Sequence, residues 1–344
     1  ATFTQSNTLR RIDANGKVTR LAGSGEVFAG ARDGLGRTAR FSSPTALVAD
    51  SLGNSYVAGY DHTIRKISPN GMVSTLAGKA GEAGYQDGSG SNARFNYPQA
   101  LALGKDGNLY VADGGNKVVR VVTPAGVVTT LTSTGASLQY PYGLAFDNSG
   151  TLYVEDSQQI VAIGADGSVR SYPFTVALSW HSGLTGGASG NLYAVSGYSI
   201  VKLSTDGTMT TIAGDMGQPG YADGVGSAAR FQKIGGMTAD AAGNLYVADT
   251  FNQTIRKVTP AGVVSTVVGQ AGVRGVQLGT AGRLHQPVGV TVGTRHGRPA
   301  LFILNRAHQG DWQQGVGLAY PWIEPSPAGQ YWQSDVNVVS VPLP

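Results

Sequence analysis

The chain has 344 residues, with 51 glycines, no cysteine, only 13% charged residues and a formal net charge of +4. The absence of cysteine excludes disulfides and thiolate metal sites. The mild charge argues against nucleic-acid binding, which needs a concentrated basic face. No apolar run approaches the roughly 18 residues of a membrane-spanning helix. High glycine and low charge together favour an all-β protein with many tight turns, because glycine tolerates positive φ.

Two kinds of hairpin alternate along the chain. The opening segment "NTLRRIDANGKVTRLAG" (residues 7–23) is a hairpin around Asn-Gly, and "HTIRKISPNGMVSTLAG" from His62 follows the same plan. Between such hairpins lie short apolar segments that follow Gly-Asn or Asp-Gly turns, among them "NSYVAG", "NLYVAD", "TLYVED" and "NLYAVS". One unit is therefore four short antiparallel strands in roughly 40 to 50 residues, which is the size of a propeller blade.

Each end of the chain holds half a unit. Residues 7–23 are a second hairpin with no first hairpin before them, and residues 287–305 are a first hairpin with no second one after them. We therefore predict an all-β, six-bladed β-propeller of four-stranded antiparallel blades, its ring closed by pairing of the N-terminal strands with the C-terminal strands. The propeller is predicted to span residues 1–305. Residues 306–344 are predicted to form an aromatic tail packed on it, in which "DVNVVSVPL" is compatible with an additional strand.

The stretch "GYQDGSGSNARFNYPQALALGKDGNLYVADGGNKVVRVVTPAGVVTTL" (residues 84–131) resembles the NHL-repeat β-propellers, and the resemblance extends over about residues 7–305. It implies the propeller fold but no single activity, since that family includes sensor domains, protein- and RNA-binding modules and several enzymes. The Asn-His-Leu motif after which the family is named is replaced in this chain by other triplets, namely Asp61-His62-Thr63, Asn116-Lys117-Val118 and Asn252-Gln253-Thr254. This variation indicates that these positions support a loop rather than shared chemistry.

Charged residues that recur from unit to unit are interpreted as architecture. We expect an Asp–Arg pair to pin the connection into a unit, with a phenylalanine wedged between blades. The residues concerned are Asp33, Asp87 and Asp223, Arg40, Arg94 and Arg230, and Phe41, Phe95 and Phe231. Aspartates ending the "YVAD"-type strands are expected to accept backbone amides of the following turn; these are Asp113, Asp156 and Asp249. Arg65-Lys66 and Arg256-Lys257 lie on alternating strands and are expected to be partly exposed.

Functional residues are expected among those that depart from the repeat. The connections into the first strand of each unit, and the turns between its second and third strands, emerge on the same face, where the central channel opens. Aromatic and polar departures from the repeat gather at these junctions. The predicted binding residues are Tyr60, Gln99, Tyr142, Trp180, His181, His285 and Arg306.

A metal site is the other reading of this face. Lactonase-like propellers hold a divalent ion with convergent Glu, Asn and Asp side chains, and the comparable set here is Glu155, Asp156 and Asn305, with Asp61 as a further candidate. Such a site implies a divalent cation such as calcium or zinc. Amidating lyases of similar fold instead place zinc-binding histidines after the first-strand proline. That site does not carry over, because the corresponding residues are Thr45, Gln99, Tyr142, Ser182 and Val288.

Three classes of function follow from this reading. We predict a secreted or periplasmic monomer that binds a small molecule, glycan, peptide or protein through the channel face, with no nucleic-acid partner and no membrane insertion. The start at Ala1 rather than Met is compatible with cleavage of a signal peptide. The alternatives are a metal-assisted lyase or lactone hydrolase acting at the central channel, and a scaffolding module. Whether the protein is an enzyme stays open at this point.

Overall fold

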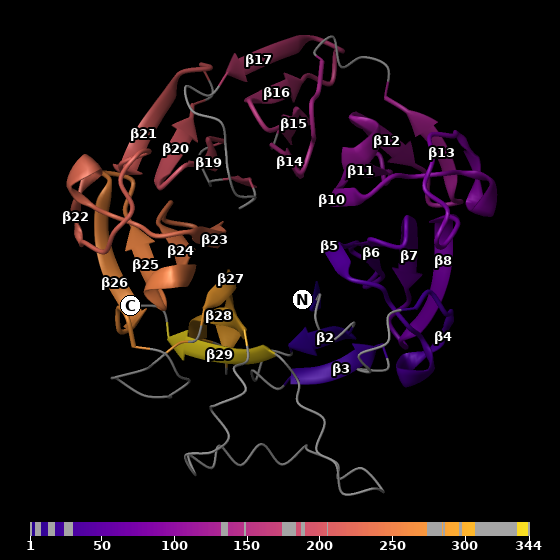
Figure 1. Ribbon diagram of the computed structural model, residues 1–344, viewed down its shortest axis with the longest axis horizontal. Helices are drawn as coiled ribbons and strands as arrows, with labels where there is room; N and C mark the ends of the chain where they lie inside the picture. The colour runs from indigo at the N-terminus through magenta and orange to yellow at the C-terminus, as the bar shows by residue number, and fades with distance from the viewer. Residues whose placement is uncertain are drawn as a thin grey trace, which may run out of the picture.

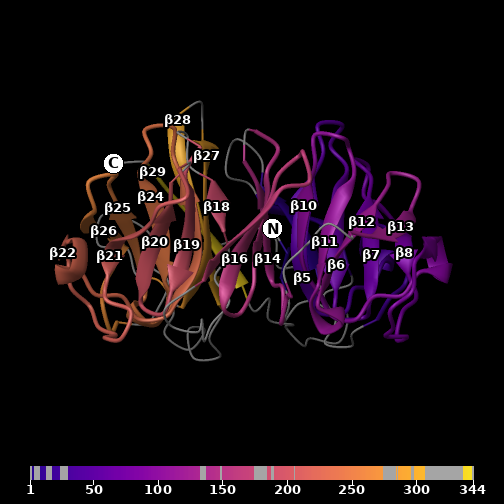
Figure 2. The same cartoon turned by 90° about the horizontal axis from the view of Figure 1, so that it is seen from above.

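The computed structural model describes residues 2–3, 8–12, 18–23, 30–131, 137–147, 149–173, 184–186, 190–204, 206–273, 284, 286–295, 298–306 and 336–342. Regular structure in these ranges is β-strand, apart from five single-turn 3₁₀ segments. Figure 1 shows the strands grouped into sheets around a central space, and Figure 2 shows them running between the two faces of the ring. None of the described helices has the length or apolar character to span a bilayer.

The described residues form seven sheets. The N-terminal sheet contains β1 (Thr2–Phe3), β2 (Thr8–Ile12) and β3 (Val18–Ala22). The first sheet contains β4 (Gly34–Leu35), β5 (Pro44–Ala49), β6 (Ser55–Gly59), β7 (Thr63–Ile67) and β8 (Met72–Gly78). The second contains β9 (Gly88–Ser89), β10 (Pro98–Leu103), β11 (Leu109–Asp113), β12 (Val118–Val122) and β13 (Val127–Thr130). The third contains β14 (Gly143–Phe146), β15 (Leu152–Glu155), β16 (Gln159–Ile163) and β17 (Val169–Pro173).

The remaining sheets follow in chain order around the central space (Figure 1). The fourth contains β18 (Thr185–Gly186), β19 (Leu192–Ser196), β20 (Ser199–Leu203) and β21 (Met209–Gly214). The fifth contains β22 (Gly224–Val225), β23 (Ile234–Ala239), β24 (Leu245–Asp249), β25 (Thr254–Val258) and β26 (Val263–Gly269). The C-terminal sheet contains β27 (Pro287–Arg295), β28 (Arg298–Arg306) and β29 (Val336–Pro342). The 3₁₀ segments are η1 (Gly36–Thr38), η2 (Gly90–Asn92), η3 (Gly114–Asn116), η4 (Gly226–Ala228) and η5 (Thr250–Asn252). Each numbered sheet contains a four-strand antiparallel meander, as predicted, and the first, second and fifth sheets add a short fifth strand.

Local sequence explains the hairpins. In the turn between β5 and β6, the Asp50 carboxylate accepts the backbone amides of Leu52 and Asn54 at 3.0 and 2.8 Å. Gly53 follows with φ of +82°, a conformation that favours glycine. The hydroxyl of Tyr56 donates to the other Asp50 oxygen at 3.1 Å, so the turn is tied to the strand that leaves it. Residues close in sequence therefore set this hairpin before any sheet packs on another.

Apolar side chains hold neighbouring sheets together. Tyr56, Ala58 and Ile64 of the first sheet form one buried cluster with Phe95 and Leu101 of the second. The predicted wedging role of the phenylalanines is confirmed, since Phe41, Phe95 and Phe231 are 3%, 0% and 0% exposed. A four-stranded sheet cannot bury both faces alone, which is why the unit recurs.

The predicted partners of the connection aspartates are wrong. Asp33, Asp87 and Asp223 form ion pairs with Arg65, Arg120 and Arg256 at 2.5–2.6 Å. Arg94 and Arg230 reach Glu82 and Asp215 instead, at 2.8 and 3.9 Å. The connection folds back as a short fifth strand on the last strand of its own sheet, as in the pairing of β9 with β13. Its aspartate therefore meets the arginine of the adjacent third strand.

The predicted partial exposure of the basic strand residues holds for Lys66 and Lys257, which are partly exposed, whereas the arginines are buried. Arg65, Arg120 and Arg256 are at most 1% exposed, and each guanidinium lies 5.2–5.4 Å from the centre of a wedge phenylalanine ring. The third and fourth sheets lack the short fifth strand and carry Val161 and Val201 at the corresponding positions. Buried arginine and folded-back connection thus occur together, which indicates that the arginine serves to anchor the connection.

The predicted pairing that closes the ring is wrong. β28 pairs with β29 over seven residue pairs, from Ala300–Pro342 to Arg306–Val336, while β2 pairs with β1 and β3. Among the described strands, none links the N-terminal sheet to the C-terminal sheet. The apolar stretch 336–342 is longer than β2 and satisfies the edge of β28, an arrangement that the repeat pattern did not reveal. The count of six blades is not confirmed.

Candidate functional site

Three tyrosines from consecutive sheets gather on the face where the predicted site lies. Tyr60 follows β6, whereas Tyr97 and Tyr140 precede β10 and β14. The rings of Tyr60 and Tyr97 meet edge to face with centres 5.7 Å apart, and each residue is 46% exposed. We call Tyr60, Tyr97, Gln99 and Tyr140 the tyrosine cluster. Edge-to-face packing holds such rings in place, so the cluster presents a preformed aromatic surface.

Gln99 joins two of these tyrosines. Its side-chain amide donates to the hydroxyl of Tyr140 at 3.2 Å and to the backbone carbonyl of Tyr97 at 3.3 Å. Burial raises the pKa of Tyr140, and its neighbours Tyr60 and Tyr97 add to the effect. The phenol of Tyr140 therefore stays protonated at neutral pH. The amide and hydroxyl groups give the cluster a polar component beside its aromatic one.

His62 packs against Tyr97 of the tyrosine cluster. It is 8% exposed, and its ring packs edge to face on Tyr97 with centres 4.8 Å apart. Its Nδ1 accepts the backbone amide of Tyr97 at 3.2 Å. Burial lowers the pKa of His62, although the Asp61 carboxylate opposes this shift. The imidazole is therefore neutral, as an acceptor nitrogen requires.

The positive φ of Tyr97 recurs at the equivalent residues of other sheets. Its φ is +50°, and the equivalent residues Ser43, Lys233 and Gln286 have φ of +42°, +52° and +43°. Such angles are costly for a bulky side chain. Because the conformation recurs at the start of four sheets, it belongs to the architecture. What distinguishes the second sheet is that a tyrosine occupies the position.

A second feature of this face is the buried carboxyl of Glu155, the last residue of β15. Ala58, Ala112 and Ala248 occupy the corresponding strand position in the first, second and fifth sheets. Glu155 is 0% exposed, and neither carboxylate oxygen has a hydrogen-bond partner among the described residues. Burial raises its pKa to about 8, so the group is largely protonated at neutral pH.

The residue opposite Glu155 makes room for this side chain. Gly143 pairs with Glu155, whereas Ala46 and Ala100 lie at this position in the first two sheets. A Cβ added at Gly143 would lie 2.5 Å from Oε2 of Glu155, closer than such contacts allow. Glycine also occurs at this position in other units, as Gly236 and Gly289, so what distinguishes the third sheet is the glutamate, which the small residue opposite it accommodates.

Tyr142 is a buried residue rather than an exposed residue of the channel face. It is 7% exposed, and its amide donates to the backbone carbonyl of Glu155 at 3.0 Å. Burial raises the pKa of its phenol well above the usual range, and the carboxyl groups of Glu155 and Asp156 add to this. The predicted grouping of Tyr60 and Gln99 is present in the tyrosine cluster, but Tyr142 is not an exposed member of it.

Asp156 has a structural role. Its oxygens accept the amides of Gln139 and Tyr140 at 2.9 and 2.6 Å. Asp113 and Asp249 likewise accept the amides of Asn96 and Gln232. The prediction that these aspartates accept backbone amides is confirmed, but the amides belong to the connection that precedes the first strand, not to the following turn.

The metal-binding set of Glu155, Asp156 and Asn305 stays a prediction, because the structure describes Asn305 only through its strand pairing. Asp156 is occupied by backbone amides, and Asn305 is described only as a residue of β28 that pairs with Pro287 and Asn337. Among the described residues, no group of three or more His, Cys, Asp or Glu side chains is arranged to hold a metal ion. Trp180, His181 and His285 lie outside the described residues, and Arg306 is described only as the end of β28.

Sequence reasoning missed Tyr97 as a member of the site. Tyr97 and Tyr140 occupy the same place, directly before the proline that leads into the first strand of a sheet. A pair of tyrosines at equivalent positions of adjacent units was the available signal for Tyr97.

Comparisons with known proteins agree with the fold. Residues 95–122 match the NHL repeat. Over 128 residues the chain is 34% identical to NHL repeat-containing protein 2 of Bos taurus, a match that covers 34% of this chain and 18% of that protein. The chain thus matches less than a fifth of the length of its curated relatives.

Two solved structures are similar over most of the chain. A streptogramin B lyase aligns with a TM-score of 0.62 at 16% identity, covering 87% of this chain and 84% of that one. An auxiliary nutrient binding protein from Bacteroides thetaiotaomicron aligns with a TM-score of 0.56 at 19% identity, covering 76% and 66%. At these identities the likeness shows a shared β-propeller fold and no shared chemistry.

Proposed function

We propose that this chain, which has a β-propeller fold and matches the NHL repeat over residues 95–122, is a binding protein whose tyrosine cluster recognises a glycan, peptide or protein surface. The observation that carries the proposal is the pair of half-exposed, edge-to-face rings of Tyr60 and Tyr97. Fixed tyrosines offer a large contact area at little cost in side-chain entropy, and their hydroxyls supply hydrogen bonds at the rim. Gln99 adds an amide of the kind that pairs with sugar hydroxyls or peptide groups.

Substitution of the exposed tyrosines tests this proposal. A glycan array and a displayed peptide library provide the ligand, and calorimetry measures its affinity for each variant. We expect Tyr97→Ala and Tyr60→Ala each to weaken binding by about tenfold or more, as truncation of an aromatic anchor does.

Tyr221→Ala is the matched control. Tyr221 is 45% exposed, but it lies beside the fifth sheet, where its ring stacks on Arg256. Its removal should leave affinity unchanged. If both cluster variants bind the selected ligand as tightly as the parent protein does, the proposed site is incorrect.

A metal-assisted lyase or lactone hydrolase is the second candidate, with calcium or zinc as the implied ion. The feature that favours it is Glu155, a buried carboxyl group without a described partner on a strand next to the innermost one (Figure 1). Buried titratable groups are typical of sites that move protons or bind cations. The described geometry supports this candidate less well, because Asp156 already accepts two backbone amides.

Elemental analysis distinguishes the two candidates. An enzyme of this kind is expected to carry about one metal ion per chain, and Glu155→Gln should lower that content because an amide is a poorer cation ligand. Glu82→Gln, at an exposed glutamate, is the control and should leave the metal content unchanged. Metal-free protein after growth and dialysis with both ions would eliminate the metal-assisted candidate.

A further inference from the structure

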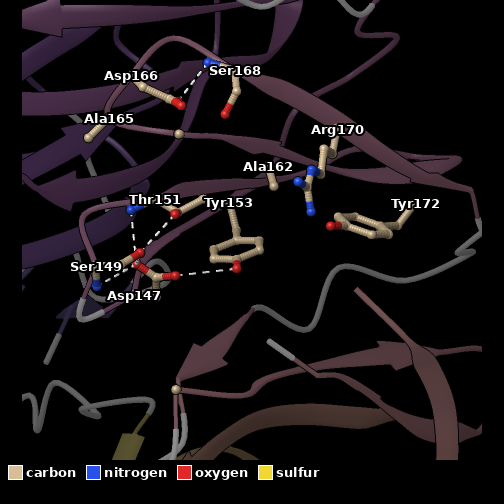
Figure 3. A pocket seen from close by; sticks show the side chains of 12 residues that line it. Asp147, Ser149, Thr151, Tyr153, Ala162, Ala165, Asp166, Ser168, Arg170 and Tyr172 are labelled. Atoms are coloured by element: carbon tan, nitrogen blue, oxygen red, sulfur yellow. Dashed lines mark hydrogen bonds between the residues drawn. The ribbon is translucent and has the colours of Figure 1, made fainter. Parts of the chain in front are cut away.

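A cavity of about 620 Å³ lies beside the third sheet (Figure 3). Its lining includes Tyr153, Ala162, Arg170 and Tyr172 from strands β15 to β17. Gly190, just before β19 of the fourth sheet, also lines it, so the cavity lies between two sheets. The turns that border it join β14 to β15 and β16 to β17, at the opposite ends of the strands from the tyrosine cluster.

The cavity lies where the third sheet has a small residue in place of a lysine that the first, fourth and fifth sheets share; the second sheet has Val121 there. In the first and fifth sheets, Lys66 and Lys257 pair across the ladder with Tyr56 and Tyr246. Each lysine ammonium lies over the tyrosine ring, 5.8 and 5.9 Å from its centre. In the third sheet the pair is Tyr153 and Ala162. Alanine leaves the ring of Tyr153 uncovered, and the space that the lysine would fill is open.

The third sheet also has an arginine, Arg170 on β17, where the other numbered sheets have an uncharged residue. Ala162 pairs with Arg170, whereas Lys66, Lys202 and Lys257 pair with Ser74, Thr210 and Ser265. A large aromatic residue is gained as well. Tyr172 pairs with Ile160, where the equivalent isoleucines of the first, fourth and fifth sheets face only Ala77, Ala213 and Val268. Three departures from the repeat therefore converge on one cavity.

Figure 3 shows how the new groups lie. The guanidinium of Arg170 extends into the space between the rings of Tyr153 and Tyr172. Among the described residues Arg170 forms no ion pair within 4 Å, although its charge contributes to lowering the pKa of the Asp166 carboxyl. The guanidinium has an aromatic ring on either side and can donate hydrogen bonds to a ligand.

The acidic residues nearby are already engaged. Asp147 accepts the backbone amides of Ser149 and Thr151 at 2.8 and 2.9 Å and the hydroxyl of Tyr153 at 3.3 Å. Asp166 accepts the amide of Ser168 at 2.9 Å. These carboxylates hold the two turns in shape, as Asp50 does in the first sheet. Arg170 is thus the charged group that the cavity offers to an incoming molecule.

We propose that this cavity binds a sugar that carries a carboxylate, such as a uronic acid unit of an acidic polysaccharide. The planar guanidinium of Arg170 matches a carboxylate with two parallel hydrogen bonds, and tyrosine rings pack against the apolar face of a pyranose. A volume of about 620 Å³ is within the range of sites that hold small organic ligands. The site does not depend on the tyrosine cluster, and the two sites can be tested separately.

Calorimetric titration with digalacturonic acid, and with an uncharged galactose disaccharide for comparison, tests the proposal. The acidic sugar should bind and the neutral one should bind at least about tenfold more weakly, because only the former pairs with the guanidinium. Arg170→Ser introduces the residue that the first and fifth sheets have at this position, and it should lower affinity for the acidic sugar about tenfold or more.

Ala162→Lys is the sharper variant, because it restores the lysine of the repeat and fills the cavity. It should abolish binding while thermal unfolding stays close to that of the parent protein. Tyr97→Ala, in the tyrosine cluster, should leave binding of the acidic sugar intact, so failure of one site is distinguishable from failure of the other. No binding of digalacturonate up to about 10 mM, equal binding of both sugars, or unchanged binding by Ala162→Lys would each overturn the proposal.

Discussion

The protein should lose stability as pH rises from 5 to 9, and Glu155→Gln should remove most of that loss. The carboxyl of Glu155 has a pKa of about 8 in the folded protein because it is buried, against 4.5 in an unfolded chain. Between these values the unfolded state releases the proton and the folded state retains it. Raising the pH therefore favours unfolding throughout this window, and the loss is complete above pH 8.

The expected size of this effect is large for one side chain. At 1.36 kcal/mol per pH unit, the free energy of unfolding falls by about 3 kcal/mol at pH 7 and about 5 kcal/mol at pH 9, relative to pH 4. Glutamine has the same shape but does not ionise, so the variant lacks this term. Other raised carboxyl pKa values, such as that of Asp249, are common to both proteins and cancel in the difference.

Chemical denaturation at pH 5, 7 and 9 measures the difference between the two proteins. Glutamine also buries an amide, which adds a constant cost, so the slope with pH is the diagnostic quantity rather than the absolute stability. Glu82→Gln is the control at an exposed glutamate and should give a curve parallel to that of the parent protein. Parallel curves for the parent protein and Glu155→Gln would show that Glu155 is not held protonated.

Arg256→Met is expected to destabilise the protein by about 3–5 kcal/mol, because it leaves a buried charge without its partner. The guanidinium donates to Asp249 at 2.9 Å, to Asp223 at 2.6 Å and to the carbonyl of Ala222 at 2.6 Å. Asp249 is 0% exposed, and burial raises its pKa to about 6 even with Arg256 in place. Methionine fills much of the space but cannot satisfy these acceptors.

Arg230→Met provides the matched comparison within the same sheet. Arg230 lies at the surface, 3.9 Å from Asp215, with both side chains partly exposed. Exposed ion pairs contribute little, so this change should cost no more than about 1 kcal/mol. Denaturant unfolding of the two variants tests which arginine anchors the connection. Equal losses would mean that Arg256 does not act through its buried ion pairs.

Two features with a proposed role in function are residues of the third sheet that differ from the equivalent residues of the other sheets. These are Glu155, which lies opposite Gly143, and Arg170, which lies opposite Ala162, both in the third sheet. Each could have been found in the sequence by comparing the units position by position. Their consequences depend on the neighbouring fourth sheet, because burial and cavity shape are set where two sheets face each other.

The sequence by itself determined the hairpins, the meander of each sheet and the wedge phenylalanines. The hairpins and the meander depend on interactions within one unit, such as the Asp50 turn, and the phenylalanines were recognisable because they recur at the same place in several units. Local turn chemistry and alternation act over a few residues, so they need no knowledge of the rest of the chain.

Only the tertiary structure decided which strand completes the last sheet, which arginine each connection aspartate meets, and which tyrosines gather on one face. β29 competes with β2 for the edge of β28, Arg65 competes with Arg40 for Asp33, and Tyr60 joins Tyr97 across a boundary between sheets. For the strand edge and for the aspartate the sequence contains two chemically similar partners, and for the tyrosines it does not say which sheets are neighbours. The choice between them is made by distances in space, which the packing of whole sheets sets and no local pattern encodes.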